Sequence, residues 1–367
     1  MAFSVTQTQF QSRGAVCHYG ELCNDNEVVL SWVYDCGKKA FIQQIPSNRD
    51  LDFIFVSHFD ADHVNSIADL KIGKNTQIFI PYVPAPLFLV LLFFYLERYS
   101  ISGRAFIKEV YAKLAPLWNE RRDINESMNI PENLFSYYFD DSIIQTDLLF
   151  SNMTVVGDKE EGISLSNGTI PWEFYVSSYI DTSFIGAVQQ LANNIISQKI
   201  HRMRLLKTGL KMLKSQYCSI NYGCPQDDIR NIISMCVYSG PTINNTDINI
   251  QNTGWLHTGD SCFHHTAVLD YFLNVFQGYI PRTHVLSLAH HGSNKTNTNI
   301  VLGRLFANFS NAEVVIPYST AVKKCCHRNQ SFNSVYCTEN QDVSFVNNSS
   351  QAIKTVFPCL NCHCKIF

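Results

Sequence analysis

The chain is poor in charged residues, and this shortage excludes several classes of protein. Only 16% of its 367 residues are charged, whereas about a quarter is usual in soluble domains. Its 28 basic and 31 acidic residues leave a formal net charge of −3, so no overall electrostatic attraction to nucleic acid is expected. Because 46% of the residues are hydrophobic, long disordered tails are disfavoured. The length fits two domains or one large α/β core with insertions.

The chain also lacks a hydrophobic run that could span a membrane. The longest apolar run, Leu87–Leu96, is too short for a bilayer core of about 30 Å. This run predicts a buried helix or a contact with a second subunit or partner protein. The first residues show no basic stretch followed by an apolar one, as a signal peptide would. Without that signal, the 13 cysteines are expected to be reduced or metal-bound. We therefore expect a cytoplasmic protein without membrane association.

Short runs of β-forming residues, separated by turn residues and helical stretches, predict an α/β fold. The expected strands are residues 28–34, 51–57, 77–80, 172–177, 254–258, 285–288 and 314–316, and the expected helices are residues 87–117 and 185–215. Polar residues follow several of the strands. Loops that leave strand ends can converge on one crevice, so a site is expected there.

The second expected helix carries a basic face without acidic residues. The basic residues are Lys199, Arg202, Arg204, Lys207, Lys211 and Lys214, and apolar residues recur among them at helical spacing. One interpretation is a solvated face above a core stripe. The other is a surface that contacts the phosphate backbone of a nucleic acid.

The strongest chemical signal is a cluster of four candidate ligands directly after the strand at 51–57. His58, Asp60, Asp62 and His63 lie within six residues. In an extended turn, alternate residues point the same way, so His58, Asp60 and Asp62 can face one space. Imidazole and carboxylate ligands together suit zinc or manganese.

This cluster resembles the metallo-β-lactamase fold, whose signature is His-x-His-x-Asp-His. Asp60 stands where the second His is usual, which is similar to the ComEC-type branch, the metallo-hydrolase domain of competence DNA-uptake proteins. Further segments are similar to family motifs and follow the family order: Val33–Gly37 ending in Asp-Cys-Gly, Thr258–Asp260 reading Thr-Gly-Asp, His290–Ser293 reading His-His-Gly-Ser, and a late strand at 314–316 leading to His327.

The resemblance implies a site with two divalent metal ions, zinc or manganese. His58 and Asp60 would hold one ion, Asp62 and His63 the other, and Asp260 would bridge them. His291, or alternatively His290, would complete the second ion's ligands, and Asp35 would orient a ligand without binding metal. The family's usual third-motif His has no clear counterpart, because residues 64–256 contain only His201. A single metal ion is therefore the alternative.

The resemblance also implies a hydrolase. Metal ions would activate a water for attack on a phosphodiester, Asp62 would accept a proton, and His291 or His327 would stabilise the leaving group. The expected substrate is DNA or another nucleic acid. The alternatives are a hydrolase of a small ester or phosphoester, such as a nucleotide or phosphocholine, and a non-catalytic sensor or binding module.

Four segments are expected along the chain. Residues 1–85 and 146–330 would form the two parts of an αββα metallo-β-lactamase sandwich, with the basic helix at 185–215. Residues 86–145 would be a largely helical insertion, through which the chain could self-associate, and residues 331–367 a Cys-rich tail. In that tail Cys359, Cys362 and Cys364, with Cys337 or Cys325, have the spacing of a structural zinc site. Reduced cysteines without metal are the alternative.

Overall fold

The computed structural model describes most of the chain, but not all of it. The described residues are 3–12, 15–95, 98–120, 152–157, 162–166, 169–179, 188, 192, 233–244, 253–292, 296–309, 312–316, 335–337, 343–348 and 351–355. No helix within these ranges is both long and apolar enough to cross a membrane.

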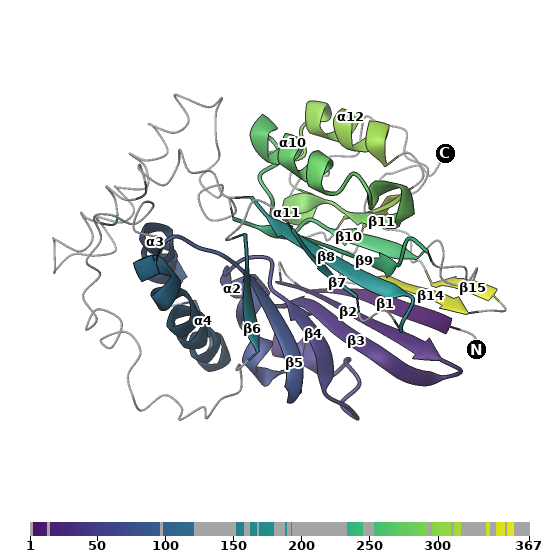
Figure 1. Cartoon of the computed structure of the whole chain (residues 1–367), viewed down its shortest axis with the longest axis horizontal. Helices are drawn as coiled ribbons and strands as arrows, with labels where there is room; N and C mark the ends of the chain where they lie inside the picture. Colours follow the sequence, from purple (N-terminus) through teal and green to yellow (C-terminus); the bar gives the residue numbers. More distant parts are fainter. Residues whose placement is uncertain are drawn as a thin grey trace.

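The fold is mixed α/β, with two mixed β-sheets (Figure 1). The 8-stranded sheet has the order β15-β14-β1-β2-β3-β4-β5-β6, and the 7-stranded sheet has the order β13-β12-β11-β10-β9-β8-β7. The first sheet consists of β1 (Phe3–Ser12), β2 (Ala15–Asn24), β3 (Glu27–Cys36), β4 (Leu51–Phe55), β5 (Ile72–Pro81), β6 (Met153–Val156), β14 (Val343–Asn348) and β15 (Gln351–Thr355). The second consists of β7 (Ile163–Leu165), β8 (Trp172–Ser178), β9 (Met235–Pro241), β10 (Gly254–His257), β11 (Thr283–Ser287), β12 (Glu313–Ile316) and β13 (Val335–Cys337).

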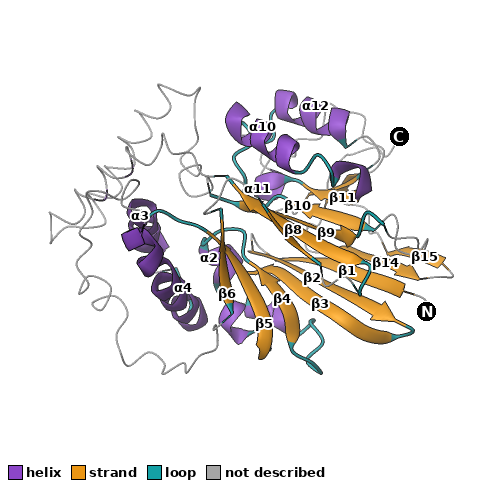
Figure 2. Cartoon of the chain, viewed as in Figure 1, coloured by secondary structure: helices purple, strands orange, loops and turns teal. Residues whose placement is uncertain are grey.

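Helices cover the outer faces of the two sheets (Figure 2). The helices are α1 (Lys39–Ile42), α2 (Ala61–Val64), α3 (Ala85–Tyr95), α4 (Ile101–Glu120), α10 (Thr266–Val275), α11 (Ala289–Gly292) and α12 (Asn299–Asn308), with short 3₁₀ turns at Ile67–Asp69 and Ile280–Arg282. Residues of α1 to α4 share one buried cluster with the 8-stranded sheet, whereas α10 and α12 share another with the 7-stranded sheet. The order of layers is therefore helix, sheet, sheet, helix.

Side chains that point alternately to the two faces of the central strands explain this layering. On β4, Ile54 packs against the helices, while Phe55 belongs to the cluster between the sheets. That cluster joins Trp32 and Phe55 of one sheet to Trp172 and Phe174 of the other, and the rings of Trp32 and Phe174 lie 5.2 Å apart. Successive side chains of a strand point to opposite faces of the sheet. One apolar strand therefore packs against the helices with one face and against the other sheet with the opposite face.

Helices α3 and α4 lie between β5 and β6, which are parallel neighbours in the sheet. The expected apolar run at 87–96 begins on α3, and Leu87 to Leu92 are buried in the same cluster as the sheet. The chain's own core thus covers these six side chains, and their hydrophobicity alone requires no second subunit.

Each sheet changes from antiparallel to parallel pairing at its middle, and this places the site. Strand β3 pairs antiparallel with β2 and parallel with β4. In the other sheet, β10 pairs antiparallel with β9 and parallel with β11. The loops that follow β3, β4, β10 and β11 leave the carboxyl ends of these strands. Such ends are where α/β sheets build their sites.

Candidate metal centre

The loops after β4 and β10 bring His58, His63 and Asp260 together. Each of these residues offers one ligand atom, and the three atoms lie within 4.8 Å of one another. The Nε2 atom of His58 lies 3.8 Å from Asp260 Oδ2, and Nε2 of His63 lies 3.7 Å from Asp260 Oδ1. All three side chains are almost fully buried. Two imidazoles and one carboxylate form the ligand set of many catalytic zinc sites, which keep a fourth position for water.

Asp35 and Ser57 fix the orientation of both imidazoles. Asp35, the penultimate residue of β3, has a φ of 57°, a left-handed conformation that Asp tolerates better than most residues. Its carboxylate accepts hydrogen bonds from the Ser57 amide at 2.7 Å and from the Ser57 hydroxyl at 2.6 Å. Nδ1 of His63 lies 2.8 Å from Asp35 Oδ2, and Nδ1 of His58 lies 2.9 Å from Ser57 Oγ.

These contacts select one tautomer for each ring. The Ser57 proton goes to Asp35, so the Ser57 oxygen accepts from Nδ1–H of His58. A carboxylate can only accept, so His63 also donates from Nδ1. Both neutral rings then present the lone pair of Nε2 to the centre, as metal-binding histidines do. Among the described residues, Nε2 of His58 is buried and has no hydrogen-bond partner, which fits a nitrogen that binds a metal ion.

The charges around His63 favour a cation at this position. Burial alone would lower the pKa of His63, but the negative charges of Asp35 and Asp260, the hydrogen bond to Asp35 and the charge of Asp62 together raise it to about 10. A proton or a metal cation can satisfy this excess of negative charge.

The structure places the other expected ligands at the rim of the same group. Asp60 Oδ2 lies 3.7 Å from His58 Nε2, and Asp62 stands half-buried in the first turn of α2. The His290 ring, from α11, has its Nε2 3.8 Å from Asp260 Oδ2. The resemblance assigned His58 and His63 to different ions, whereas here both rings face Asp260 with centroids 4.0 Å apart.

Other expected site residues fall outside the described part of the chain. They are His327, the basic residues Lys199, Arg202, Arg204, Lys207, Lys211 and Lys214, and the tail cysteines Cys359, Cys362 and Cys364. His291 and Cys337 lie in described backbone, in α11 and β13, but their side chains are not described. These assignments remain predictions.

Two glycines allow the backbone to approach the centre closely. A Cβ on Gly37 would lie 1.7 Å from the Asp62 carbonyl oxygen. Gly259 has a φ of 52°, and a Cβ there would lie 2.4 Å from Ser234 Oγ and 2.7 Å from the Ser57 Cβ. Ser234 Oγ also accepts a hydrogen bond from the Asp260 amide at 2.9 Å. Glycine is therefore required at both positions for the ligand-bearing loops to pack as they do.

Behind the ligands, two further histidines lie between the sheets. His257 of β10 and His18 of β2 are buried, with ring centroids 4.1 Å apart, and the His257 ring stacks on Tyr34. Burial lowers the pKa of His257 to about 3, so this ring is neutral near pH 7. His257, His63 and Asp260 line a cavity of about 20 Å³, which is room for roughly one water.

The sequence pattern singled out the carboxylates and histidines but missed the serines and Tyr34. Ser57 and Ser234 hold Asp35 and Asp260 in place, and Tyr34 donates to the Met235 carbonyl at 2.9 Å. The one signal for Ser57 was its position between a strand and the ligand cluster.

Neither a protein-family model nor a curated protein matches the chain. The fold and the site thus define a mixed α/β protein with a buried His/Asp cluster suited to a metal ion. Any function must be argued from that cluster.

Proposed function

We propose that this chain is a metal-dependent hydrolase of the metallo-β-lactamase fold, similar to the ComEC-type branch, and that it cleaves phosphodiester bonds in DNA or another nucleic acid. The observation that carries the proposal is the convergence of His58, His63 and Asp260 from two different sheets, with both rings oriented through Asp35 and Ser57. The layered fold and the order of the motifs along the chain support it. The choice of substrate rests on the resemblance and on the basic segment at 199–214.

Each residue has a role in this proposal. His58, His63 and Asp260 would hold one zinc or manganese ion, with Asp60 beside them. A second ion would need Asp62 together with His290 or His291. Such metal ions lower the pKa of a water and polarise a phosphoryl oxygen. We assign Asp62 to accept the proton of the attacking water, because it is the carboxylate of the cluster with the most contact with solvent.

Metal content and hydrolysis test the proposal together. The purified full-length chain would be incubated with Zn²⁺, Mn²⁺ or Mg²⁺ and assayed on labelled single-stranded DNA, double-stranded DNA and bis(p-nitrophenyl) phosphate. We expect metal-dependent cleavage that falls by about 100-fold or more in Asp260→Asn, because losing a ligand should exceed the 10–100-fold effect of losing an outer contact.

Asp270→Asn is the matched control, since Asp270 is an exposed carboxylate on α10 that pairs with Arg304. Its activity should equal that of the unmodified chain. Turnover of the small phosphodiester without cleavage of DNA would replace the nuclease with a small-ester hydrolase. Metal binding without any turnover would leave a sensor or binding module, and absence of metal binding would refute the proposal.

A further inference from the structure

Residues 98–103, which comprise the three residues before α4 and the start of that helix, contact the ligand-bearing loop at both of its ends. We call these residues the connecting segment. The loop comprises residues 58–65 and includes α2. Its first end meets the connecting segment at Tyr99 and its second at Ser100. The two helices between β5 and β6 are therefore tied directly to the loop that carries two of the candidate ligands, His58 and His63.

Tyr99 makes the contact at the first end. Its hydroxyl donates to the Phe59 carbonyl oxygen at 2.6 Å, and the side chain is only 4% exposed. Burial, followed by the negative charges of Asp60 and Asp62, raises the pKa of Tyr99 well above its usual value. The hydroxyl therefore keeps its proton and remains a donor throughout the physiological pH range.

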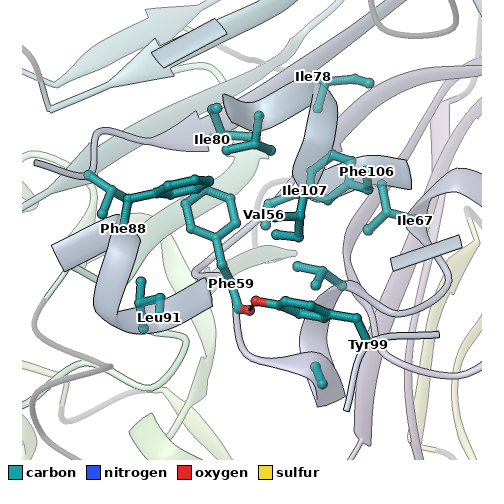
Figure 3. Close-up of a cluster of buried hydrophobic side chains, with 14 of the residues drawn as sticks. Val56, Phe59, Ile67, Ile78, Ile80, Phe88, Leu91, Tyr99, Phe106 and Ile107 are labelled. Carbon is teal, nitrogen blue, oxygen red and sulfur yellow. Dashed lines mark hydrogen bonds between the residues drawn. The ribbon is translucent and has the colours of Figure 1, made fainter. Parts of the chain in front are cut away.

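Phe59 explains why this carbonyl matters. Figure 3 shows its ring inside the apolar cluster beside Phe88 of α3, while its backbone oxygen faces the Tyr99 hydroxyl. Phe59 stands between His58 and Asp60 in the chain. With its ring directed into the core, its neighbours are directed the other way, so that the His58 imidazole faces both Asp260 and Asp60. Holding the Phe59 peptide thus fixes the direction of two candidate ligands.

Asn65 provides the contact at the second end, where α2 stops. Its Nδ2 donates to the Arg98 carbonyl at 3.1 Å, and its Oδ1 accepts from the Ser100 amide at 2.8 Å. The Ser100 hydroxyl donates to the Asn65 carbonyl at 2.5 Å. Gly103 leaves room for this contact, because a Cβ there would lie 2.4 Å from Asn65 Oδ1.

We propose that Tyr99 is a positioning residue of the metal centre, which acts through the Phe59 carbonyl to hold His58 and Asp60 in a metal-binding arrangement. Through the connecting segment, helices α3 and α4 and the ligand-bearing loop then form one structural unit. This inference rests on the proposed function, since it assigns Tyr99 a role in the same centre.

The test is Tyr99→Phe in the full-length chain, which removes one hydroxyl and keeps the ring. We expect the affinity for Zn²⁺, measured by competition with a chelator, to fall about tenfold, as for other contacts that orient metal ligands. In protein stripped of metal, hydrogen exchange of the amides of residues 63–65, which bond within α2, should accelerate about fivefold after one buried hydrogen bond is lost.

Tyr238→Phe is the matched control. Tyr238 is also fully buried and donates to a backbone carbonyl, that of Pro241 at 3.4 Å, in the other sheet. This variant should lose some stability but keep its Zn²⁺ affinity and its α2 exchange rates. If Tyr99→Phe matches Tyr238→Phe in both measurements, Tyr99 does not position the site. If the unmodified chain binds no Zn²⁺ at all, the proposed function fails, while faster α2 exchange in Tyr99→Phe alone would still show that Tyr99 holds the loop.

Discussion

At the scale of single residues, Ser57 connects the two candidate histidine ligands to Asp35. We expect Ser57→Ala to lower the affinity for Zn²⁺ about tenfold, because the His58 ring loses the acceptor that selects its tautomer. The variant should also lose about 1–3 kcal/mol of unfolding free energy, since a buried oxygen of Asp35 loses a donor. Chelator competition and urea unfolding measure the two effects.

Ser239→Ala separates these two effects. Ser239 is also fully buried, and its hydroxyl donates to Gln7 Oε1 at 3.1 Å rather than to Asp35 or a described candidate ligand. It should lose stability and keep its affinity for metal. An equal loss of affinity in both serine variants would mean that Ser57 acts only on the fold.

The sequence was sufficient to propose the ligand candidates and the orienting Asp35, but not the other residues that hold them in place. His58, Asp60, Asp62 and His63 form a local pattern with a recognisable spacing. Tyr99, by contrast, reaches Phe59 from 40 positions away, and Tyr34 reaches Met235 from 201 positions away. A hydrogen bond between such distant residues leaves no trace in local spacing, so it becomes visible only once the chain is folded.

At the scale of elements, helix α2 depends on the close approach of Gly37. In Gly37→Ala the new Cβ would meet the Asp62 carbonyl at 1.7 Å, and because that atom is backbone, α2 must move. We expect a loss of about 1–3 kcal/mol in unfolding free energy, typical of overpacking, together with weaker metal binding. Urea unfolding measures the change in stability.

Substitution of a second glycine by alanine should raise the unfolding free energy instead of lowering it. Gly303 is exposed within α12, and a Cβ there would meet nothing within 4 Å. Gly303→Ala should therefore raise the unfolding free energy by about 0.5–1 kcal/mol, because alanine restricts the unfolded chain and favours the helix. Equal stability of the two alanine variants would contradict the packing described at Gly37.

All seven predicted strands were confirmed, but others were missed. Strands β1 and β9 were not predicted. In β1, polar side chains such as Gln7 and Gln9 are buried inside the protein. Gln7 donates to the Thr253 carbonyl at 2.8 Å, so its burial is compensated by a segment far along the chain. An alternation rule that places polar residues outside cannot identify such a strand.

At the scale of the whole molecule, the contact between His18 and His257 makes the stacking of the two sheets sensitive to acid. Burial lowers the pKa of His257 to about 3 and that of His18 well below its usual value. In the unfolded chain both would titrate near 6.5. The contribution of these two neutral histidines to the unfolding free energy is complete above pH 6.5. It is lost as the pH falls toward 3, because over that range only the unfolded state takes up the protons.

The measurement is urea unfolding at a series of pH values for the unmodified chain and for His257→Phe. We expect the unmodified chain to lose up to about 1.4 kcal/mol more per pH unit than the variant between pH 6.5 and 3. Parallel curves for the two proteins would show that His257 already carries a proton in the folded state.

The distance in sequence between the two sheets also determines the order in which the protein can be assembled. His63 and Asp260 are separated by roughly 200 residues, which a ribosome adds in about 10–40 s at 5–20 residues per second. Until β8 and β9 are made within that interval, Trp32, Phe55 and Phe79 have no opposing sheet. The nascent first half thus exposes an aromatic face to other chains and chaperones, and the candidate centre is complete only after synthesis has passed Asp260.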